Sequence, residues 1–285
     1  MTVDILILTF AAILVALLLR AIWEPTRIEV TRIQLPVDSP DDGDDNRTGS
    51  ISVLRVLFFS DLHMDYLRIR EKHLMQAVRG LTPDLILFGG DLTAKQSCLH
   101  SAIALLARLR QQPGLSQAPL VAVPGNHDTP EGITAMAQAG FTVLQNQDFQ
   151  IHCHDQSWQI IGLQDKRLGC PDAAAALQSA RMAGIPPQQR IVLVHNPDSL
   201  LDVPPGQADW FCAGHFHGGQ IWMPFRLEFR LLRDEKLPRT GLYKGLISWG
   251  DMTGYISRGL GCVLFPLRFR SVPELVYLEF KAQDF

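Results

Sequence analysis

Five short apolar runs recur along the chain, and each of them ends in polar residues. Their lengths are those of buried strands, at residues 53–59, 84–88, 120–123, 190–194 and 210–213. Segments with a helical spacing of apolar residues separate most of them, at residues 70–80, 97–111, 131–139 and 172–183. This alternation, followed by a strand-rich C-terminal part, predicts a layered α/β fold.

The residues that follow these strands belong to few chemical types. They are carboxylates, imidazoles and one amide: Asp61, His63, Asp91, Asn126, His127, His195, His215 and His217. In layered α/β folds, the carboxyl ends of the strands form the edge at which ligands bind. We therefore expect these side chains to share one site.

The chemistry of this set favours metal ions. Carboxylate, imidazole and amide oxygen suit divalent ions such as manganese, iron or zinc. No cysteine belongs to the set, which argues against a structural zinc site. The eight groups exceed the needs of one ion, whereas two ions about 3.5–4 Å apart, bridged by a carboxylate, would use them. Such a pair would stabilise the attacking and leaving oxygens of a displacement at phosphorus and lower the pKa of a bridging water.

Each motif alone has an ordinary structural explanation. Gly-Asp at 90–91 is usually a turn, Gly-His at 214–215 a loop, and a strand-end histidine such as His195 a capped polar residue. Five motifs in order, all after strands, favour the functional interpretation. The histidines in helical segments or at alternating strand positions are expected to be surface or packing residues: His73, His100, His152 and His154.

At these positions the sequence resembles the calcineurin-like metallophosphoesterases. The shared motifs are D-x-H, G-D, G-N-H-D, a lone strand-end histidine and G-H-x-H, in this order between residues 61 and 217. Later motifs resemble one bacterial branch of the family, at residues 218–221, 255–261, 266–269 and 273–274. That branch has an N-terminal membrane segment and includes phosphodiesterases and UDP-2,3-diacylglucosamine pyrophosphatases. The resemblance covers about residues 27–281 and implies a four-layer α/β/β/α sandwich.

The resemblance also implies a role for each residue of the set. Two divalent metal ions would be held, the first by Asp61, His63 and His217 and the second by Asn126, His195 and His215. Asp91 would bridge the two ions. Manganese is the preferred metal, with iron, zinc or magnesium as alternatives. His127 would protonate the leaving oxygen or stabilise the transition state, and Asp128 would orient His127.

A longer apolar run lies near the N-terminus, at residues 5–19, and contains one threonine and no charge. It is shorter than the roughly 20 residues that span a bilayer, but Arg20 can extend to the headgroups and residues 21–23 continue the apolar stretch. We predict a membrane anchor over residues 1–24 and one phosphoesterase domain over residues 25–285. A cleaved signal peptide fits less well, because the start is not basic and no small-x-small site follows. A buried core helix is the third alternative.

The distribution of charge and cysteine bears on location and partners. Arginines follow the anchor and no lysine or arginine precedes it, so the positive-inside rule places the domain on the cytoplasmic side of the inner membrane. The net charge of −3 gives no sign of nucleic-acid binding. The five cysteines form no CxxC pair, so neither a disulfide framework nor a zinc–thiolate site is indicated. Residues 36–50 are acidic, and we expect a flexible, solvated loop there.

Two later features are candidates for substrate contact. Arg258, between a serine and a glycine, is either an anion clamp at the phosphoryl group or an ordinary turn arginine. Residues 221–232 mix apolar and basic side chains directly after the last histidine motif. They are either a hairpin packed on the core or a surface that enters the membrane or holds acyl chains, with Trp222 and Phe225 among its apolar contacts.

Together these features predict a membrane-anchored dimetal phosphohydrolase that cleaves a phosphodiester or pyrophosphate bond. The preferred substrate is UDP-2,3-diacylglucosamine, giving UMP and 2,3-diacylglucosamine 1-phosphate in lipid A biosynthesis; the family branch and the anchor support it. One alternative is a phosphodiesterase or phosphatase acting on a soluble or cell-envelope substrate. Another is a non-catalytic membrane scaffold, against which the complete ligand set argues. The oligomeric state does not follow from the sequence.

Overall fold

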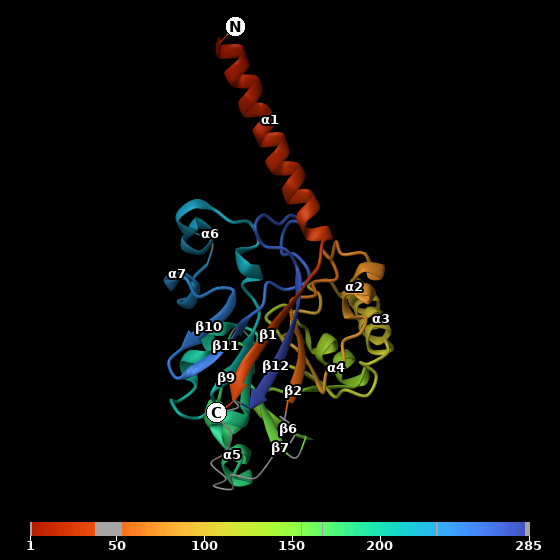
Figure 1. Ribbon diagram of the computed structural model, residues 1–285, viewed down its shortest axis with the longest axis vertical. Coiled ribbons are helices and arrows are strands. Elements are labelled where there is room, and N and C mark those ends of the chain that lie inside the picture. Colours follow the sequence, from red (N-terminus) through yellow and green to blue (C-terminus); the bar gives the residue numbers. More distant parts are fainter. Residues whose placement is uncertain (1, 38–52, 155, 167, 232, 283–285) are drawn as a thin grey trace.

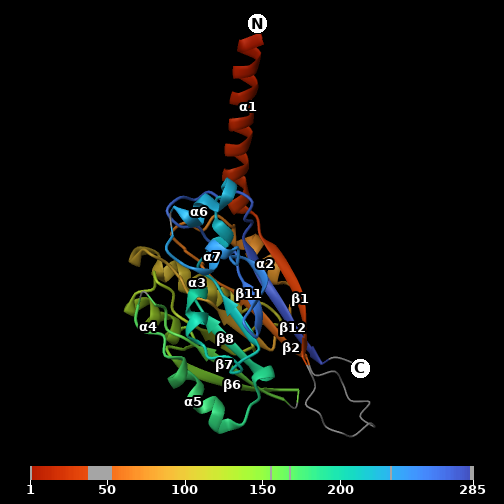
Figure 2. The ribbon, with the colours of Figure 1, turned by 90° about the vertical axis from the view of Figure 1, so that its left-hand side faces the viewer.

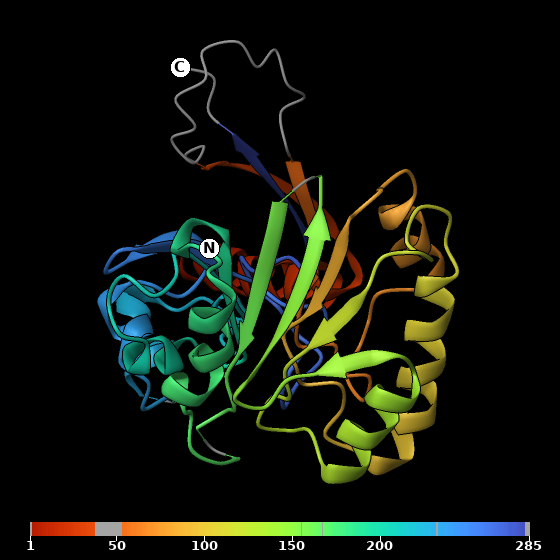
Figure 3. The same ribbon diagram turned by 90° about the horizontal axis from the view of Figure 1, so that it is seen from below.

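Two six-stranded sheets lie face to face, and helices cover their outer faces (Figures 1 and 3). The computed structural model describes residues 2–37, 53–154, 156–166, 168–231 and 233–282. The strand order in the first sheet is β1 (Glu29–Val37), β12 (Glu274–Ala282), β2 (Val53–Phe59), β3 (Leu85–Phe88), β4 (Leu120–Ala122) and β5 (Phe141–Val143). In the second sheet it is β10 (Gly245–Trp249), β11 (Met252–Ile256), β9 (Trp210–Ala213), β8 (Arg190–Val194), β7 (Gln156–Gly162) and β6 (Gln147–Cys153).

The outer layers are helical. The first sheet is covered by α2 (Glu71–Val78), α3 (Leu99–Arg110) and α4 (Pro130–Gln138), and the second by α5 (Ala173–Ala183), α6 (Leu227–Arg230) and α7 (Leu237–Thr240). Local signals explain the ends of two of them. Thr129 caps α4 with its hydroxyl ahead of Pro130, while Asp172 caps α5 and Gly184 ends it in a left-handed conformation. The four helices expected from the sequence are confirmed, with ends shifted by at most two residues.

The alternation of side chains along the strands explains the layers. In β2, Leu57 and Phe59 pack beneath the helices of the first outer layer, whereas Val56 and Phe58 face the second sheet. A third core, which contains Val192 of β8, separates the second sheet from its own helices. The three cores confirm the predicted four-layer α/β/β/α sandwich.

Helix α1 (Thr2–Trp23) projects away from the sandwich (Figures 1 and 2). It is long and apolar enough to cross a bilayer, and none of its apolar window is buried. This exposure excludes the alternative of a buried core helix. A short 3-10 helix, Glu24–Thr26, joins α1 to β1. Most of the acidic stretch at 36–50 lies outside the described residues, and its first two residues belong to β1.

Strand order places the base of α1 and the ends of the central strands at the same end of the domain. β12 is parallel to β1, with Glu274 opposite Glu29, and antiparallel to β2, with Val276 opposite Phe58. The start of β1 therefore lies near the end of β2. Because β2, β3 and β4 are parallel, their carboxyl ends all lie at the end of the domain from which α1 projects.

Candidate metal centre

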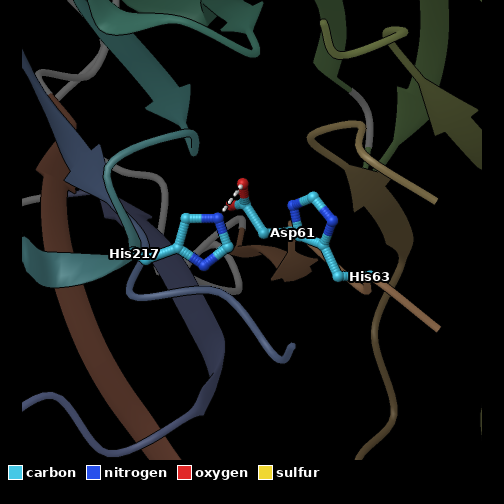
Figure 4. Close-up of side chains that lie close together, drawn as sticks. All are labelled: Asp61, His63 and His217. Carbon is cyan, nitrogen blue, oxygen red and sulfur yellow. Dashed lines mark ion pairs between the residues drawn. The ribbon is translucent and has the colours of Figure 1, made fainter. Parts of the chain in front are cut away.

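Side chains from the strand ends meet in two buried groups. In each group, the candidate ligand atoms lie within 4.8 Å of one another: Asp61, His63 and His217 form the first, and Asp91, His195 and His215 the second. Figure 4 shows the first group, in which His217 meets Asp61 and His63 from a different segment of the chain. β2 and β3 of one sheet and β8 and β9 of the other precede these residues, so the centre lies at the edge predicted from the sequence.

The first group is closed to solvent. His217 Nε2 lies 3.3 Å from Asp61 Oδ1, and both side chains are at most 1% exposed. His217 Nδ1 lies 3.3 Å from the carbonyl of Gly261 and 3.4 Å from a guanidinium nitrogen of the buried Arg268, so that Nε2 is the ring nitrogen that faces the group. His63 Nε2 is buried and makes no well-aligned hydrogen bond among the described residues, although Asp91 Oδ2 lies 3.2 Å from it. A metal ion between these two atoms would satisfy both of them.

His195 is at the centre of the second group. Its Nδ1 donates to the carbonyl of Gly89 at 2.7 Å, so that Nε2 points inward. Three acceptor atoms surround this nitrogen, namely Asn126 Oδ1 at 3.2 Å, His215 Nδ1 at 3.1 Å and Asp91 Oδ2 at 3.3 Å. A proton on Nε2 can point at only one of these acceptors at a time, whereas a cation can bind all four atoms. The donor set therefore fits a divalent metal ion.

Asp91 joins the two groups. Its Oδ2 lies 3.2 Å from His63 Nε2 and 3.3 Å from His195 Nε2, while Oδ1 accepts the backbone amide of His127 at 2.8 Å. Burial alone would raise the pKa of Asp91, but the charges of His195 and His63 beside it hold it well below its usual range. Burial would likewise lower the pKa of His195, yet Asp91 raises it to about 10. One carboxylate oxygen thus faces both groups, as a bridging ligand must.

Backbone strain is concentrated at the centre. Five members have positive φ angles, which residues other than glycine rarely adopt: Asp61 at 52°, His63 at 39°, Asp91 at 60°, His215 at 71° and His217 at 51°. Such conformations persist where the surroundings fix them, and they cluster at functional sites. Here the amide of Asp61 donates to the carbonyl of Gly90 at 2.8 Å, and the amide of His63 to the carbonyl of Asp91 at 3.0 Å.

Two glycines of the motifs permit the close packing of the centre. A Cβ atom on Gly125 would lie 2.3 Å from Asp91 Oδ1 and 2.7 Å from His195 Nδ1. A Cβ atom on Gly214 would lie 2.7 Å from Asp61 Oδ2. A side chain at either position would displace a member of the centre, which explains the glycines of G-N-H-D and G-H-x-H.

His127 and Asp128 have different surroundings. The imidazole of His127 is partly exposed, and it lies edge-on to His63 with 5.2 Å between ring centres. Asp128 is buried, and its carboxylate accepts the backbone amides of Asp91, Leu92 and Gly125 at 2.7–2.8 Å. Burial raises the pKa of Asp128 to about 6. The predicted orientation of His127 by Asp128 is therefore corrected: the carboxylate ties together the two loops that carry Asp91 and His127.

A cavity of about 390 Å³ opens beside the centre. One wall is the centre itself, with His127. The rest of the lining comes from residues 219–221, Met223, Glu228, Arg233 and residues 263–265, and its apolar members are Ile221, Met223, Val263, Leu264 and Phe265. The space is thus polar on the side of the candidate metal ligands and mostly apolar on the other.

The structure does not bring the three predicted substrate contacts into this cavity. Arg258 bonds Glu274 Oε2 at 2.6 Å and Glu29 Oε2 at 3.0 Å, so two carboxylates neutralise the guanidinium and it joins β1 to β12. The anion-clamp interpretation is corrected accordingly, and the structural alternative holds. Phe225 is 81% exposed, and Trp222 stacks with Arg270. Ile221 and Met223, which flank Trp222 in the chain, line the cavity instead.

The sequence interpretation missed Glu235. His215 Nε2 donates to Glu235 Oε1 at 2.8 Å, and both side chains are only 5% exposed. Burial lowers the pKa of His215 to about 3, so the ring is neutral and its Nδ1 is the acceptor that faces His195. Glu235 stands in the charged run Arg-Asp-Glu-Lys, which is typical of a solvated surface, and no sequence signal separates it from its neighbours.

We expect Glu235→Gln to weaken binding of the metal ion held by His215 by about 10–100-fold, because partners that orient a metal-binding histidine contribute that much. Isothermal titration of the metal-free protein with manganese measures this affinity. Asp234→Asn is the matched control, because Asp234 is the adjacent acid and its side chain is fully exposed. Equal affinities for the two variants would contradict the orienting role of Glu235.

Comparison with known proteins agrees with this geometry. The family model of the calcineurin-like phosphoesterases matches residues 54–219. The chain is 31% identical to the uncharacterized metallophosphoesterase YkuE of Bacillus subtilis, over 81% of this chain and 80% of the relative. It is 33% identical to the phosphodiesterase YaeI of Escherichia coli, over 79% of this chain and 81% of the relative. It is 24% identical to the UDP-2,3-diacylglucosamine pyrophosphatase LpxG of Chlamydia trachomatis, over 95% and 96% of the two chains. The chain therefore belongs to the calcineurin-like phosphoesterase family.

Proposed function

We propose that this protein is a membrane-anchored phosphohydrolase that uses two divalent metal ions to cleave a phosphodiester or pyrophosphate bond. The observation that carries the proposal is the position of Asp91 Oδ2 between His63 and His195, each of which belongs to a complete group of candidate ligands. A scaffold without activity would have no need to keep both groups, the strained backbone and the adjoining cavity together.

The candidate ligands divide into two sets that share Asp91. One metal ion would be held by Asp61, His63 and His217, and the other by Asn126, His195 and His215. When bound, such ions neutralise charge on the phosphoryl oxygens and lower the pKa of water. Oxygen and nitrogen ligands without sulfur suit manganese, and also iron, zinc or magnesium.

The chain itself supplies a proton donor beside the centre. His127 lies in the wall of the cavity, and its backbone amide is fixed to Asp91 Oδ1 at 2.8 Å. Its ring is partly exposed, so a substrate in the cavity can reach it. We assign its ring N–H to the leaving oxygen of the phosphoryl group, where a proton or hydrogen bond stabilises the developing charge.

Arg233 supplies positive charge to the same cavity. One guanidinium nitrogen donates to the His215 carbonyl at 3.2 Å, and the group lies over the Phe216 ring, 5.7 Å from its centre. Its side chain is 23% exposed and lines the cavity, and one guanidinium nitrogen lies 3.8 Å from Glu235 Oε1, so that Glu235 holds the group beside the cavity. We assign the guanidinium to a phosphoryl oxygen of the substrate.

We expect Arg233→Gln to raise the KM for a soluble aryl phosphodiester by about tenfold or more, because a hydrogen bond to a charged group contributes about 1.5–3 kcal/mol. Steady-state kinetics measures the change. Arg230→Gln is the control, because Arg230 is exposed on α6 and lies outside the cavity wall. The same rise in KM for both variants would show a general charge effect and refute binding by Arg233.

For the substrate we prefer UDP-2,3-diacylglucosamine. The full-length similarity to LpxG, the apolar wall of the cavity and the unburied helix α1 support a lipid-linked substrate. The similarity to the phosphodiesterase YaeI supports a second candidate, a phosphodiester of the cell envelope or a soluble one. The arginines that follow α1 support a cytoplasmic position of the domain, which a reporter fused to the C-terminus would test.

One incubation distinguishes the two substrates. Detergent-solubilised protein and its Asp91→Ala variant are given UDP-2,3-diacylglucosamine and manganese, and UMP is followed by mass spectrometry. Release of UMP by the native protein alone would support the lipid A assignment. If no UMP is formed but an aryl phosphodiester is cleaved by the native protein alone, the phosphohydrolase stands and the lipid A assignment fails. Cleavage of neither substrate would refute the proposed function.

A further inference from the structure

We propose that two loops beside the cavity form a membrane-docking surface, which holds the metal centre against the headgroup layer of the bilayer that contains α1. We define this surface by Phe225 and Leu231 from the first loop and Leu264 and Phe265 from the second. The inference rests on the proposal above that α1 is a membrane anchor, and it adds that the substrate enters from the lipid surface.

Exposed apolar side chains are concentrated on these loops. Phe225 is 81% exposed, Leu231 and Leu264 are each 73% exposed, and Phe265 is 61% exposed. Outside α1, the described part of the chain has three other exposed large apolar residues, and all are less exposed: Leu168, Leu201 and Leu246 at 36–51%. Large apolar patches on a protein surface mark contacts with membranes or partners.

Hydrogen bonds join the two loops into one unit. The amide of Phe269 donates to the Gln220 carbonyl at 2.8 Å, and the amide of Trp222 donates to the Phe269 carbonyl at 3.0 Å. The side-chain amide of Gln220 donates to the Val263 carbonyl at 2.9 Å and accepts from the Val263 amide at 2.7 Å. The four apolar residues of the docking surface are therefore carried by a connected piece of structure.

The same unit is fixed to the base of α1. The amide of Arg268 donates to the carbonyl of Ala21 at 3.0 Å, within the last turn of the helix. Glu24, only 2% exposed, accepts the amide of Ser271 with its carboxylate. Arg20 lies over the ring of Phe269, 5.3 Å from its centre. α1 is thus not a loose tether, and a bilayer around it must lie next to the loops.

The two views of the whole molecule agree with these bonds. α6, which lies in the first loop, is at the end of the domain from which α1 projects in both views (Figures 1 and 2). This is also the end at which β2, β3 and β4 deliver the metal centre. The apolar surface, the anchor and the centre therefore share one end of the molecule.

The docking surface continues into the active-site cavity. Leu264 and Phe265 line the same cavity as the candidate metal ligands Asp91, His215 and His217. Ser271, bound to Glu24 at the base of α1, also donates its hydroxyl to the carbonyl of His217 at 2.5 Å. An amphiphile whose acyl chains remain in the bilayer could thus place its phosphoryl group at the centre.

The charges beside the surface suit anionic lipid headgroups. Arg226 and Arg230 are exposed on or next to α6, and the exposed Arg270 stacks on Trp222 at 4.5 Å. Glu228, the acid of the same helix, is buried with its carboxylate on the amide of Met223. Basic residues that flank apolar side chains are typical of segments that bind at the membrane interface. These charges favour a bilayer over a second copy of the chain as the partner.

Fluorescence quenching in bilayers tests the proposal with the full chain. Leu231→Trp and Leu264→Trp each add one tryptophan to a loop of the surface. His152→Trp is the matched control, because His152 is exposed on β6, at the end of the domain away from α1 (Figure 1). The variants are placed in vesicles of phosphatidylethanolamine and phosphatidylglycerol, with phosphatidylcholine brominated near the headgroup end of its acyl chains. The fluorescence of each new tryptophan is taken as the difference between the variant and the native protein. We expect this fluorescence to lose most of its intensity at both loop positions and to lose none at the control position.

The outcomes separate this inference from the proposed function, because emission does not depend on catalysis. Absence of quenching at either loop would overturn the docking surface and leave the phosphohydrolase intact. A blue shift without quenching would show burial against protein and would also overturn it. As a second measurement, Leu231→Asp should lower turnover of a phosphodiester lipid in vesicles and leave turnover of a soluble aryl phosphodiester unchanged. An equal effect on both substrates would contradict delivery from the membrane.

Discussion

Asp91→Asn is expected to lower kcat/KM for an aryl phosphodiester by about 10³-fold or more, which corresponds to about 4 kcal/mol of transition-state stabilisation. The variant keeps the shape of the side chain, and its amide oxygen can still accept the His127 amide. The variant lacks the negative charge of the carboxylate. Its NH2 group would replace Oδ2 and point N–H donors at His63 Nε2 and His195 Nε2, the nitrogens that would bind the metal ions. Kinetics and metal analysis by mass spectrometry measure the two consequences.

The control for this prediction is Asp202→Asn, which changes an exposed carboxylate paired with Lys166. We expect it to keep full activity and a full complement of metal. If Asp91→Asn kept the native metal content and activity, Asp91 would not be a bridging ligand. The division of the centre into two sets that share one oxygen would then be wrong.

His127→Gln is expected to lower kcat by about 10²–10⁴-fold, the usual contribution of a general acid, with metal content unchanged. The ring lies in the cavity wall beside the centre and is not a member of either ligand group. Because a proton donor matters most for poor leaving groups, the defect should grow as the pKa of the leaving alcohol rises across a series of aryl phosphodiesters.

His100→Gln, on the exposed face of α3, is the control for a general effect of losing a histidine. A defect of the same size for all leaving groups would show that His127 does not act on the leaving oxygen. Loss of metal from His127→Gln would instead place the residue among the ligands.

Much of the fold could be predicted from the sequence, because the central strands are almost entirely apolar. β2, β3, β8 and β9 contribute to the cores and appear as apolar runs, interrupted by Arg55 in β2 and preceded by Arg190 in β8. β5 and β7 are not predicted as strands, and β5 has only three residues. β6 is predicted only around His152, because it alternates between exposed and partly buried positions. The insertion of β12 between β1 and β2 joins residues more than 200 positions apart, which no local pattern reveals.

The metal centre could be predicted because its members follow those strands directly. Roles that depend on the partner of a side chain could not be predicted. Arg258 was compatible with an anion clamp until the structure placed Glu29 and Glu274 against it. Asp128 follows His127 in the chain, yet its carboxylate turns to backbone amides. Glu235 is buried by the tertiary fold, although its neighbours in the sequence are charged.

Anomalous diffraction from crystals soaked in manganese tests the central claim most directly. The account predicts two peaks per chain on either side of Asp91, one within coordinating distance of His63 and His217 and the other within that of His195 and His215. Asp91→Asn crystals should lose at least one of them. A single peak in the native protein, or peaks that do not share Asp91, would contradict the two-metal centre.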